Sequence, residues 1–226
     1  MELTLTGFSR AEVLQYLGWR GSEITPDVEQ QLQEGMAQTL HTAQPRYTYR
    51  VFDLLRQAEG LYLKGTGVRL PGDDLAALLR DCQTCVLLAA TLGAPVEGLM
   101  RRAAVRNRTA MVILDCCGSA AIEAVCDQAE AHILARHGQG LYPTDRFSPG
   151  YGDLPLDFQH TALALLDAPR QIGLGLTDSC ILTPRKSVTA ILGLAVRPQT
   201  KRFRGCAHCS MFETCSYRKA GKTCGR

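Results

Sequence analysis

The sequence lacks the short motifs by which many enzymes bind nucleotides. It has no P-loop, and Gly173-Leu174-Gly175 neither continues to a third glycine nor leads into an expected helix. These absences argue against a P-loop enzyme and against a dinucleotide-binding fold. The four histidines outside the C-terminal region do not form a catalytic or metal-binding pattern; they are His41, His132, His137 and His160.

The sequence also lacks the signals of secretion and membrane insertion. Residues 1–7 contain no basic segment followed by an apolar one, as a secretory signal would. No apolar run reaches the roughly 18 residues that would predict a membrane span. We therefore expect a cytoplasmic protein, whose ten cysteines are reduced or bind metal rather than form disulfides.

The length and charge distribution predict one domain with a small appendage. The chain has 226 residues, 46% of them hydrophobic and 21% charged, as in a soluble globular protein. Residues 198–226 contain seven Lys/Arg and a single acid, Glu213, so they carry +6 while residues 1–197 carry −3. We expect a body over residues 1–197 and a separate basic tail over residues 198–226.

Caps and apolar periodicity predict a mixture of helices and strands. Helices are expected at 10–17, 26–44, 73–79, 96–137 with a break near Asn107, and 156–166; the first starts at a Ser9 capping box, and the third is capped by Asp73 or Asp74. Strands are expected at 47–52, 61–63, 68–70, 86–93, 175–182 and 187–196. Because these elements do not alternate regularly, the expected fold class is α+β.

Five cysteines outside the tail are interpreted as structural residues rather than as ligands. Cys82 and Cys85 are expected at the end of a helix, just before a buried strand. Cys116, Cys117 and Cys126 fall on the long helix. Cysteine behaves as a small apolar residue in protein cores, so these five are expected to be core residues.

The stretch from Arg146 to Gly152 is the strongest candidate for a small-molecule site. The planar guanidinium of Arg146 suits a carboxylate or a phosphate. Pro149 and Gly150 favour a tight turn that lets backbone approach a ligand, and Tyr151 offers a flat face with a polar tip. On composition alone a structural turn with a surface arginine is the favoured interpretation of this stretch, because Pro-Gly turns are common.

This stretch resembles the S-adenosylmethionine-binding loop of the activation domain of cobalamin-dependent methionine synthase. The resemblance rests on Arg146-x-x-x-Gly150-Tyr151, followed by residues 176–180, Pro184 and residues 187–189 in similar order, and it is clearest over residues 118–196. It implies a mainly antiparallel sheet surrounded by helices. It also implies that Arg146 pairs with the ligand carboxylate, that Ser148 and Gly150 contribute backbone contacts, and that Tyr151 contacts the ligand.

Glu123 is a second candidate for the same site. It follows Gly118-Ser119-Ala120-Ala121, whose small side chains on the same helix leave room beside a carboxylate. The family has a ligand-binding glutamate at a similar place, although a solvated helix charge would also explain Glu123. The family's N-terminal aspartate has no counterpart in the comparable stretch, residues 16–19.

Four closely spaced cysteines in the tail predict a metal site. Cys206, Cys209, Cys215 and Cys224 suit tetrahedral zinc or an iron–sulfur cluster, with His208 as an alternative ligand. The neighbouring lysines and arginines would offset the charge of the thiolates. The spacing does not decide between the two metals.

The resemblance implies an accessory protein that supports the reductive methylation, or reactivation, of cobalamin. The chain is too short to contain the cobalamin-binding modules, so cobalamin would come from a partner methionine synthase without its own activation domain, or from another corrinoid methyltransferase. An electron donor such as flavodoxin or ferredoxin is a second expected partner, and membranes and nucleic acids are not expected partners.

One alternative is a module that senses S-adenosylmethionine while its zinc-knuckle tail contacts nucleic acid, for which the tail is suitably basic. A methyltransferase that acts alone is disfavoured by the missing glycine-rich nucleotide motif.

Overall fold

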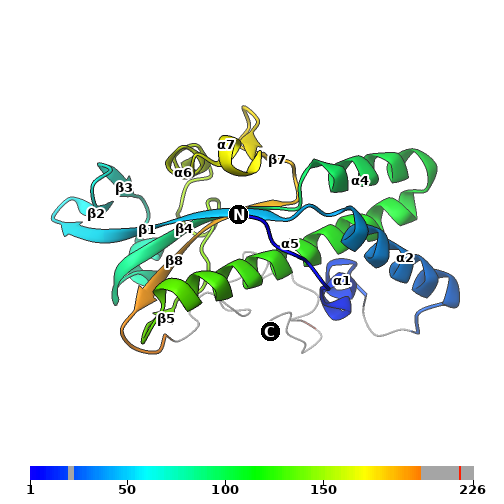
Figure 1. Ribbon diagram of the computed structural model, residues 1–226, viewed down its shortest axis with the longest axis horizontal. Coiled ribbons are helices and arrows are strands. Elements are labelled where there is room, and N and C mark those ends of the chain that lie inside the picture. Colours follow the sequence, from blue (N-terminus) through cyan, green and yellow to red (C-terminus); the bar gives the residue numbers. More distant parts are fainter. Residues whose placement is uncertain (20–22, 200–218, 220–226) are drawn as a thin grey trace.

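The fold is built on a single antiparallel sheet, seen in a computed structural model that describes residues 1–19, 23–199 and 219. Figure 1 shows the long strands crossing the middle of the molecule. The strand order is β3-β2-β1-β4-β8-β5, and all neighbouring pairs are antiparallel. The strands are β1 (Arg46–Gln57), β2 (Gly60–Leu63), β3 (Val68–Leu70), β4 (Cys82–Thr91), β5 (Tyr142–Pro143) and β8 (Ser187–Ala195).

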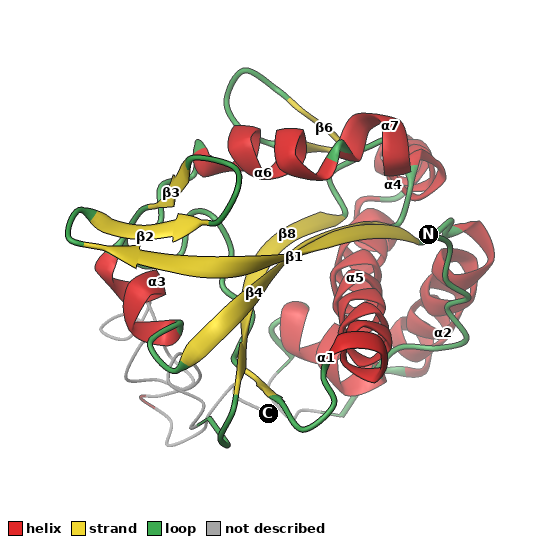
Figure 2. Ribbon diagram, turned by 60° about the vertical axis from the view of Figure 1, so that its left-hand side comes forward, coloured by secondary structure: helices red, strands yellow, loops and turns green. Residues whose placement is uncertain are grey.

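Helices cover both faces of this sheet. Figures 1 and 2 show α6 and α7 on one side of the strands and the long α5 on the other. The helices are α1 (Arg10–Tyr16), α2 (Pro26–Thr42), α3 (Asp73–Leu78), α4 (Ala94–Arg106), α5 (Arg108–His137), α6 (Phe158–Leu166) and α7 (Ala168–Ile172). A separate small hairpin joins β6 (Gly175–Leu176) to β7 (Leu182–Thr183). The expected α+β class with a mainly antiparallel sheet is confirmed.

Strand β4 is buried on both faces, which explains its continuous apolar sequence. Side chains alternate across a strand. Cys85 and Leu87 accordingly pack with α3, α6 and α7, whereas Val86 and Leu88 pack with α4 and α5. A third, smaller cluster joins α1 and α2 to the first half of α5.

Helix α5 is the central helix on the face of the sheet opposite to α6 and α7. Within the described residues it alone is long and apolar enough to cross a membrane by length and composition, but 56% of its most apolar window is buried inside the protein. The contacts of α5 with α1, α2, α4 and the sheet account for its apolar character as a core helix.

Several local predictions are confirmed by the backbone. Ser9 caps α1 by accepting a hydrogen bond from the Glu12 N–H, and Pro26 opens α2. The long helical segment breaks at Asn107, whose side chain caps α5, and Gly138 follows its last residue. The hairpin of β2 and β3 is also present.

Three local predictions are wrong. Neither Asp73 nor Asp74 caps α3: Gly72 occupies the N-cap, and the carboxylate of Asp153 accepts from the N–H groups of residues 73 and 74 at 2.5 and 3.2 Å. Cys82 and Cys85 lie within β4 rather than at a helix end, because β4 begins four residues earlier than expected. The strand expected over residues 175–182 is instead the hairpin of β6 and β7, which turns around Thr177 and Cys180.

Candidate ligand site beside helix α5

The loop that follows β5 is fixed to the sheet by Phe147. Phe147 exchanges two backbone hydrogen bonds of 2.8 Å with Ile191 of β8, and its side chain is only 2% exposed. A buried aromatic ring with both backbone groups paired holds the chain firmly at this point. The neighbouring Arg146 is thereby placed against α5.

Arg146 contacts three carboxylates that lie on one face of α5. Its Nη1 donates to Glu130 at 2.9 Å, and its Nη2 donates to Glu123 at 3.0 Å and to Asp127 at 2.8 Å. Residues spaced by four and three positions share one face of a helix, so all three carboxylates reach the same guanidinium. The Arg146 side chain is 12% exposed, the least of the four.

The surroundings of Arg146 keep it charged. Desolvation by burial acts to lower its pKa, while Cys126, the hydrogen bond to Asp127 and the charges of Glu130 and Glu123 raise it, and the net pKa is above the ordinary value. Buried charges are tolerated in proteins when they are paired in this way. Arg146 is therefore a fixed cation whose fork is occupied by side chains of the chain itself.

The second half of the loop is a tight turn with an exposed tyrosine. Gly150 has φ of 92°, a left-handed value that favours glycine, and its N–H donates to the Leu154 carbonyl. The Tyr151 N–H donates to the Ser148 carbonyl. The Tyr151 ring meets the Phe147 ring edge-on at 6.3 Å and is itself 61% exposed, so one face remains open to a ligand.

Tyr16, at the end of α1, belongs to the same region. Burial raises the pKa of Tyr16, and the nearby Glu123 and Tyr151 raise it further. Its side chain is half exposed. Tyr16 was not predicted as a site residue, because no sequence signal relates α1 to a loop 130 residues away.

Lys186 packs against the part of α5 that precedes Glu123. Lys186 follows β7 and donates from Nζ to Ser119 at 2.9 Å, and it forms an ion pair with Asp115 at 3.0 Å. Its aliphatic stem packs over Gly118, where a Cβ would come within 3.0 to 3.1 Å of three of its carbons. Gly118 and Ser119 thus accommodate Lys186, and Ala120 and Ala121 pack in the core, whereas the sequence predicted open space for a ligand beside these small residues.

The predicted residues of the body come together, and those of the tail lie outside the described residues. Arg146 and Glu123 are in direct contact, and Ser148, Gly150 and Tyr151 form the adjoining turn. The predicted metal ligands Cys206, Cys209, Cys215 and Cys224 lie outside the described residues. Over residues 1–19 and 23–199, no three His, Cys, Asp or Glu side chains gather as a metal site would require.

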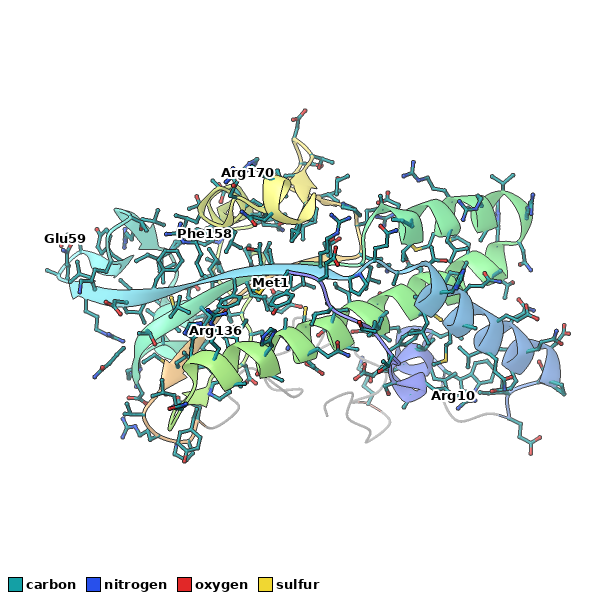
Figure 3. All side chains as sticks on the ribbon, viewed as in Figure 1. Met1, Arg10, Glu59, Arg136, Phe158 and Arg170 are labelled. Carbon is teal, nitrogen blue, oxygen red and sulfur yellow. The ribbon has the colours of Figure 1, made fainter. Side chains whose placement is uncertain are left out.

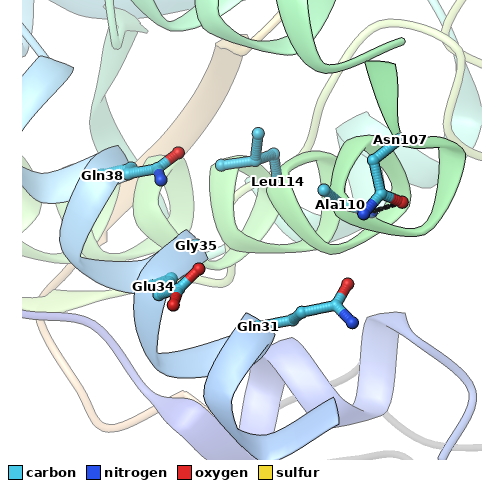
Figure 4. A pocket seen from close by; sticks show the side chains of 7 residues that line it. All are labelled: Gln31, Glu34, Gly35, Gln38, Asn107, Ala110 and Leu114. Atoms are coloured by element: carbon cyan, nitrogen blue, oxygen red, sulfur yellow. Dashed lines mark hydrogen bonds between the residues drawn. The ribbon is translucent and has the colours of Figure 1, made fainter. Parts of the chain in front are cut away.

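A small pocket elsewhere in the molecule is not part of this region. It has a volume of about 90 Å³ and lies between α2 and the first turns of α5, as Figure 4 shows. Its polar lining includes Gln31, whose Oε1 is buried without a hydrogen-bond partner among the described residues, and Asn107, which caps α5. The full lining is Gln31, Glu34, Gly35, Gln38, Asn107, Ala110 and Leu114.

Comparison with known proteins identifies the architecture. No protein-family profile and no curated protein sequence matches the chain. The fold is similar to that of the MetH reactivation domain, since a solved structure of that domain bound to AdoHcy superimposes with a TM-score of 0.65. The match covers 98% of this chain and 85% of that one, at 14% sequence identity. At this identity the similarity establishes the fold alone.

Proposed function

We propose that the protein binds S-adenosylmethionine beside α5 and supports reactivation of the cobalamin of a partner protein. The observation that carries the proposal is the similarity, over 98% of the chain, to a reactivation domain that holds AdoHcy, the demethylated form of S-adenosylmethionine. The position of the Arg146 turn against α5 supports it, because this turn carries the sequence resemblance to the S-adenosylmethionine loop of methionine synthase.

The side chains of the region suit the groups of this ligand. The Nη2 atom of Arg146 contacts Glu123 and Asp127, and a ligand carboxylate would replace one of them. The displaced carboxylate would remain near the ligand and could accept hydrogen bonds from its amino group or ribose hydroxyls. Tyr151 and Tyr16 would provide aromatic surface for the flat parts of the ligand.

The part of this chain in the reaction would be binding and orientation. Under the proposal the partner's cobalamin supplies the nucleophile that accepts the methyl group, and an electron donor supplies the reducing electron. The residues beside α5 would hold the methyl donor in one orientation and shield it from water. This role requires no general acid or base.

Calorimetry with S-adenosylmethionine tests the binding. We expect the wild type to bind and Arg146→Ala to bind at least about tenfold more weakly, since a hydrogen-bonded charge on a carboxylate contributes about 1.5–3 kcal/mol. Arg146→Lys should fall between them, because lysine keeps the charge but loses the planar fork.

The control is Arg170→Ala. Arg170 is an exposed arginine on α7, labelled in Figure 3, on the opposite side of the sheet from α5. The Arg170→Ala variant should bind S-adenosylmethionine as tightly as the wild type does. Thermal unfolding of each variant separates loss of the ligand contact from loss of the fold. A wild type that does not bind S-adenosylmethionine would overturn the proposed binding.

Reactivation is tested with a methionine synthase from which its own reactivation domain has been removed. In the presence of a reductant and S-adenosylmethionine, adding this chain should restore methylcobalamin, which is measured by its visible spectrum. At subsaturating S-adenosylmethionine, the Arg146→Ala variant should restore less methylcobalamin than the wild type. If the wild type binds S-adenosylmethionine but restores no methylcobalamin, methionine synthase is excluded as the partner, and the proposed binding site still stands.

A further inference from the structure

The two ends of the Arg146 guanidinium are occupied differently. Its Nη1 donates to the carboxylate of Glu130, whereas its Nη2 donates to the carboxylates of both Glu123 and Asp127. If one of the two carboxylates on Nη2 leaves, the other still pairs with the buried charge, so the cost of leaving a buried cation unpaired is avoided. Nη2 is therefore the atom of Arg146 at which a carboxylate of the chain can be exchanged for a carboxylate of a ligand.

Asp127 is the more exchangeable of the two carboxylates on Nη2. Its side chain is 45% exposed, against 35% for Glu123, and its hydrogen bond to Arg146 is exposed while that of Glu123 is partly buried. An exposed ion pair contributes little to stability, so breaking the Asp127 contact costs little. A ligand carboxylate that arrives at Arg146 therefore displaces Asp127 rather than Glu123.

The region beside α5 has an aromatic end and a charged end. Burial raises the pKa of Tyr16, and the charges of Glu123 and Tyr151 raise it further, which places both of these residues near the Tyr16 hydroxyl. Asp127 lies one helical turn beyond Glu123 along α5, where it contacts Arg146. Tyr16 and Tyr151 thus form the aromatic end near Glu123, while Arg146 and Asp127 form the charged end.

The proposed ligand also has two ends, and its charged end carries an ammonium as well as a carboxylate. The two groups are attached to the same carbon atom. When the ligand carboxylate takes the place of Asp127 on Nη2, the ammonium is therefore held close to the displaced Asp127 side chain. An ammonium only donates hydrogen bonds and an ionised carboxylate only accepts them, so the two form a charge-assisted pair. The displaced side chain thus gains a new partner within the same complex.

We propose that Asp127 is a positioning residue that occupies Nη2 of Arg146 in the free protein and binds the ligand ammonium in the complex. This inference rests on the proposed function, because the ligand is the one proposed there. The exchange makes Asp127 a determinant of specificity. A ligand with both a carboxylate and an ammonium displaces Asp127 from Arg146 and pairs with it again, whereas a ligand with the carboxylate alone displaces it without any return.

Calorimetry with AdoHcy and with an AdoHcy analogue whose α-amino group is replaced by hydrogen tests this role. We expect the wild type to bind AdoHcy at least about tenfold more tightly than the deaminated analogue. Asp127→Asn should weaken AdoHcy binding at least about tenfold. The same variant should bind the analogue as tightly as the wild type or more tightly, because a neutral amide competes less for Arg146. Asp127→Glu keeps the charge and should restore part of the preference for AdoHcy.

Glu130→Gln is the matched control, because Glu130 contacts the same arginine through Nη1. It should change the affinities for AdoHcy and for the deaminated analogue by the same factor. If Asp127→Asn also changes both affinities equally, or if Glu130→Gln alone removes the preference for AdoHcy, the role of Asp127 is overturned. The proposed function still stands in that case, provided that Arg146→Ala weakens binding. A wild type that binds neither S-adenosylmethionine nor AdoHcy overturns both proposals.

Discussion

Cys180 differs from the other described cysteines in being partly exposed and in contacting a histidine. It lies in the turn between β6 and β7, with its Sγ 3.4 Å from the Nε2 of His160 and its backbone at φ of 60°. The other five described cysteines are buried. Burial raises the pKa of the Cys85 and Cys117 thiols to about 12, so these remain protonated and unreactive at neutral pH.

We therefore expect Cys180 to be alkylated first among the cysteines of the body. Iodoacetamide treatment of the folded protein, followed by peptide mass spectrometry, gives a rate for each cysteine. The rate at Cys180 should exceed that at Cys85 or Cys117 by at least about 100-fold. Equal rates at Cys180 and Cys85 would contradict the burial that distinguishes them.

At the same scale, the sequence located part of the candidate site and missed the rest for a physical reason. The loop residues of the resemblance, Arg146 to Tyr151, adjoin one another in sequence, and Glu123 was found from the small residues before it. Asp127 and Glu130 were not proposed, although their spacing from Glu123 places them on the same face of α5. The helical spacing shows which carboxylates share a face of α5. Their contact with Arg146 depends on how the loop packs against α5, which the spacing does not show.

At the scale of secondary structure, helix α3 depends on a residue from another part of the chain. Asp153, which follows the Arg146 turn, accepts hydrogen bonds from the first two N–H groups of α3. Local sequence signals predicted Asp73 or Asp74 as the cap because the true cap lies 80 residues away. Where caps are local, as at Ser9 and Asn107, the sequence placed the helix ends correctly.

Replacing Asp153 should therefore destabilise the protein, whereas replacing the predicted cap should not. We expect Asp153→Ala to lower the free energy of unfolding by about 1 kcal/mol, the usual contribution of a helix cap, and Asp73→Ala to lower it by much less. Urea denaturation of the two variants measures the difference. Because Asp153 also ties the Arg146 turn to α3, Asp153→Ala should weaken S-adenosylmethionine binding as well. Equal unfolding free energies for the two variants would show that Asp153 does not act as the cap.

At the scale of the whole molecule, helices cover both faces of one sheet, and buried cysteine thiols lie in the apolar core on each side of it. Cys82 and Cys85 lie in the layer of α3, α6 and α7, while Cys117 and Cys126 lie among the helices around α5. The sequence predicted that these residues are apolar core members, and the continuous apolar run of residues 86–93 predicted a buried strand. Which helices cover each face of β4 could not be predicted, because that depends on how distant segments pack.

This arrangement predicts a loss of stability at alkaline pH. Burial raises the pKa of Cys82 to about 11 and those of Cys85 and Cys117 to about 12, while the unfolded chain has thiol pKa values of about 8.5. The folded state therefore binds more protons above about pH 8.5, and stability declines as the pH rises from there to 11 or 12. Each such thiol contributes a slope of up to about 1.4 kcal/mol per pH unit in this window.

Urea unfolding at pH 8, 9.5 and 11 measures the slope. Cys117→Ala removes one buried thiol and should make the slope shallower by up to about 1.4 kcal/mol per pH unit, even though it lowers the stability at pH 8. Cys180→Ala removes a thiol outside the core and should leave the slope as in the wild type. If the Cys117→Ala slope equals that of the wild type, the Cys117 thiol ionises as easily in the folded protein as in the unfolded chain, and the apolar layer around α5 is open to water.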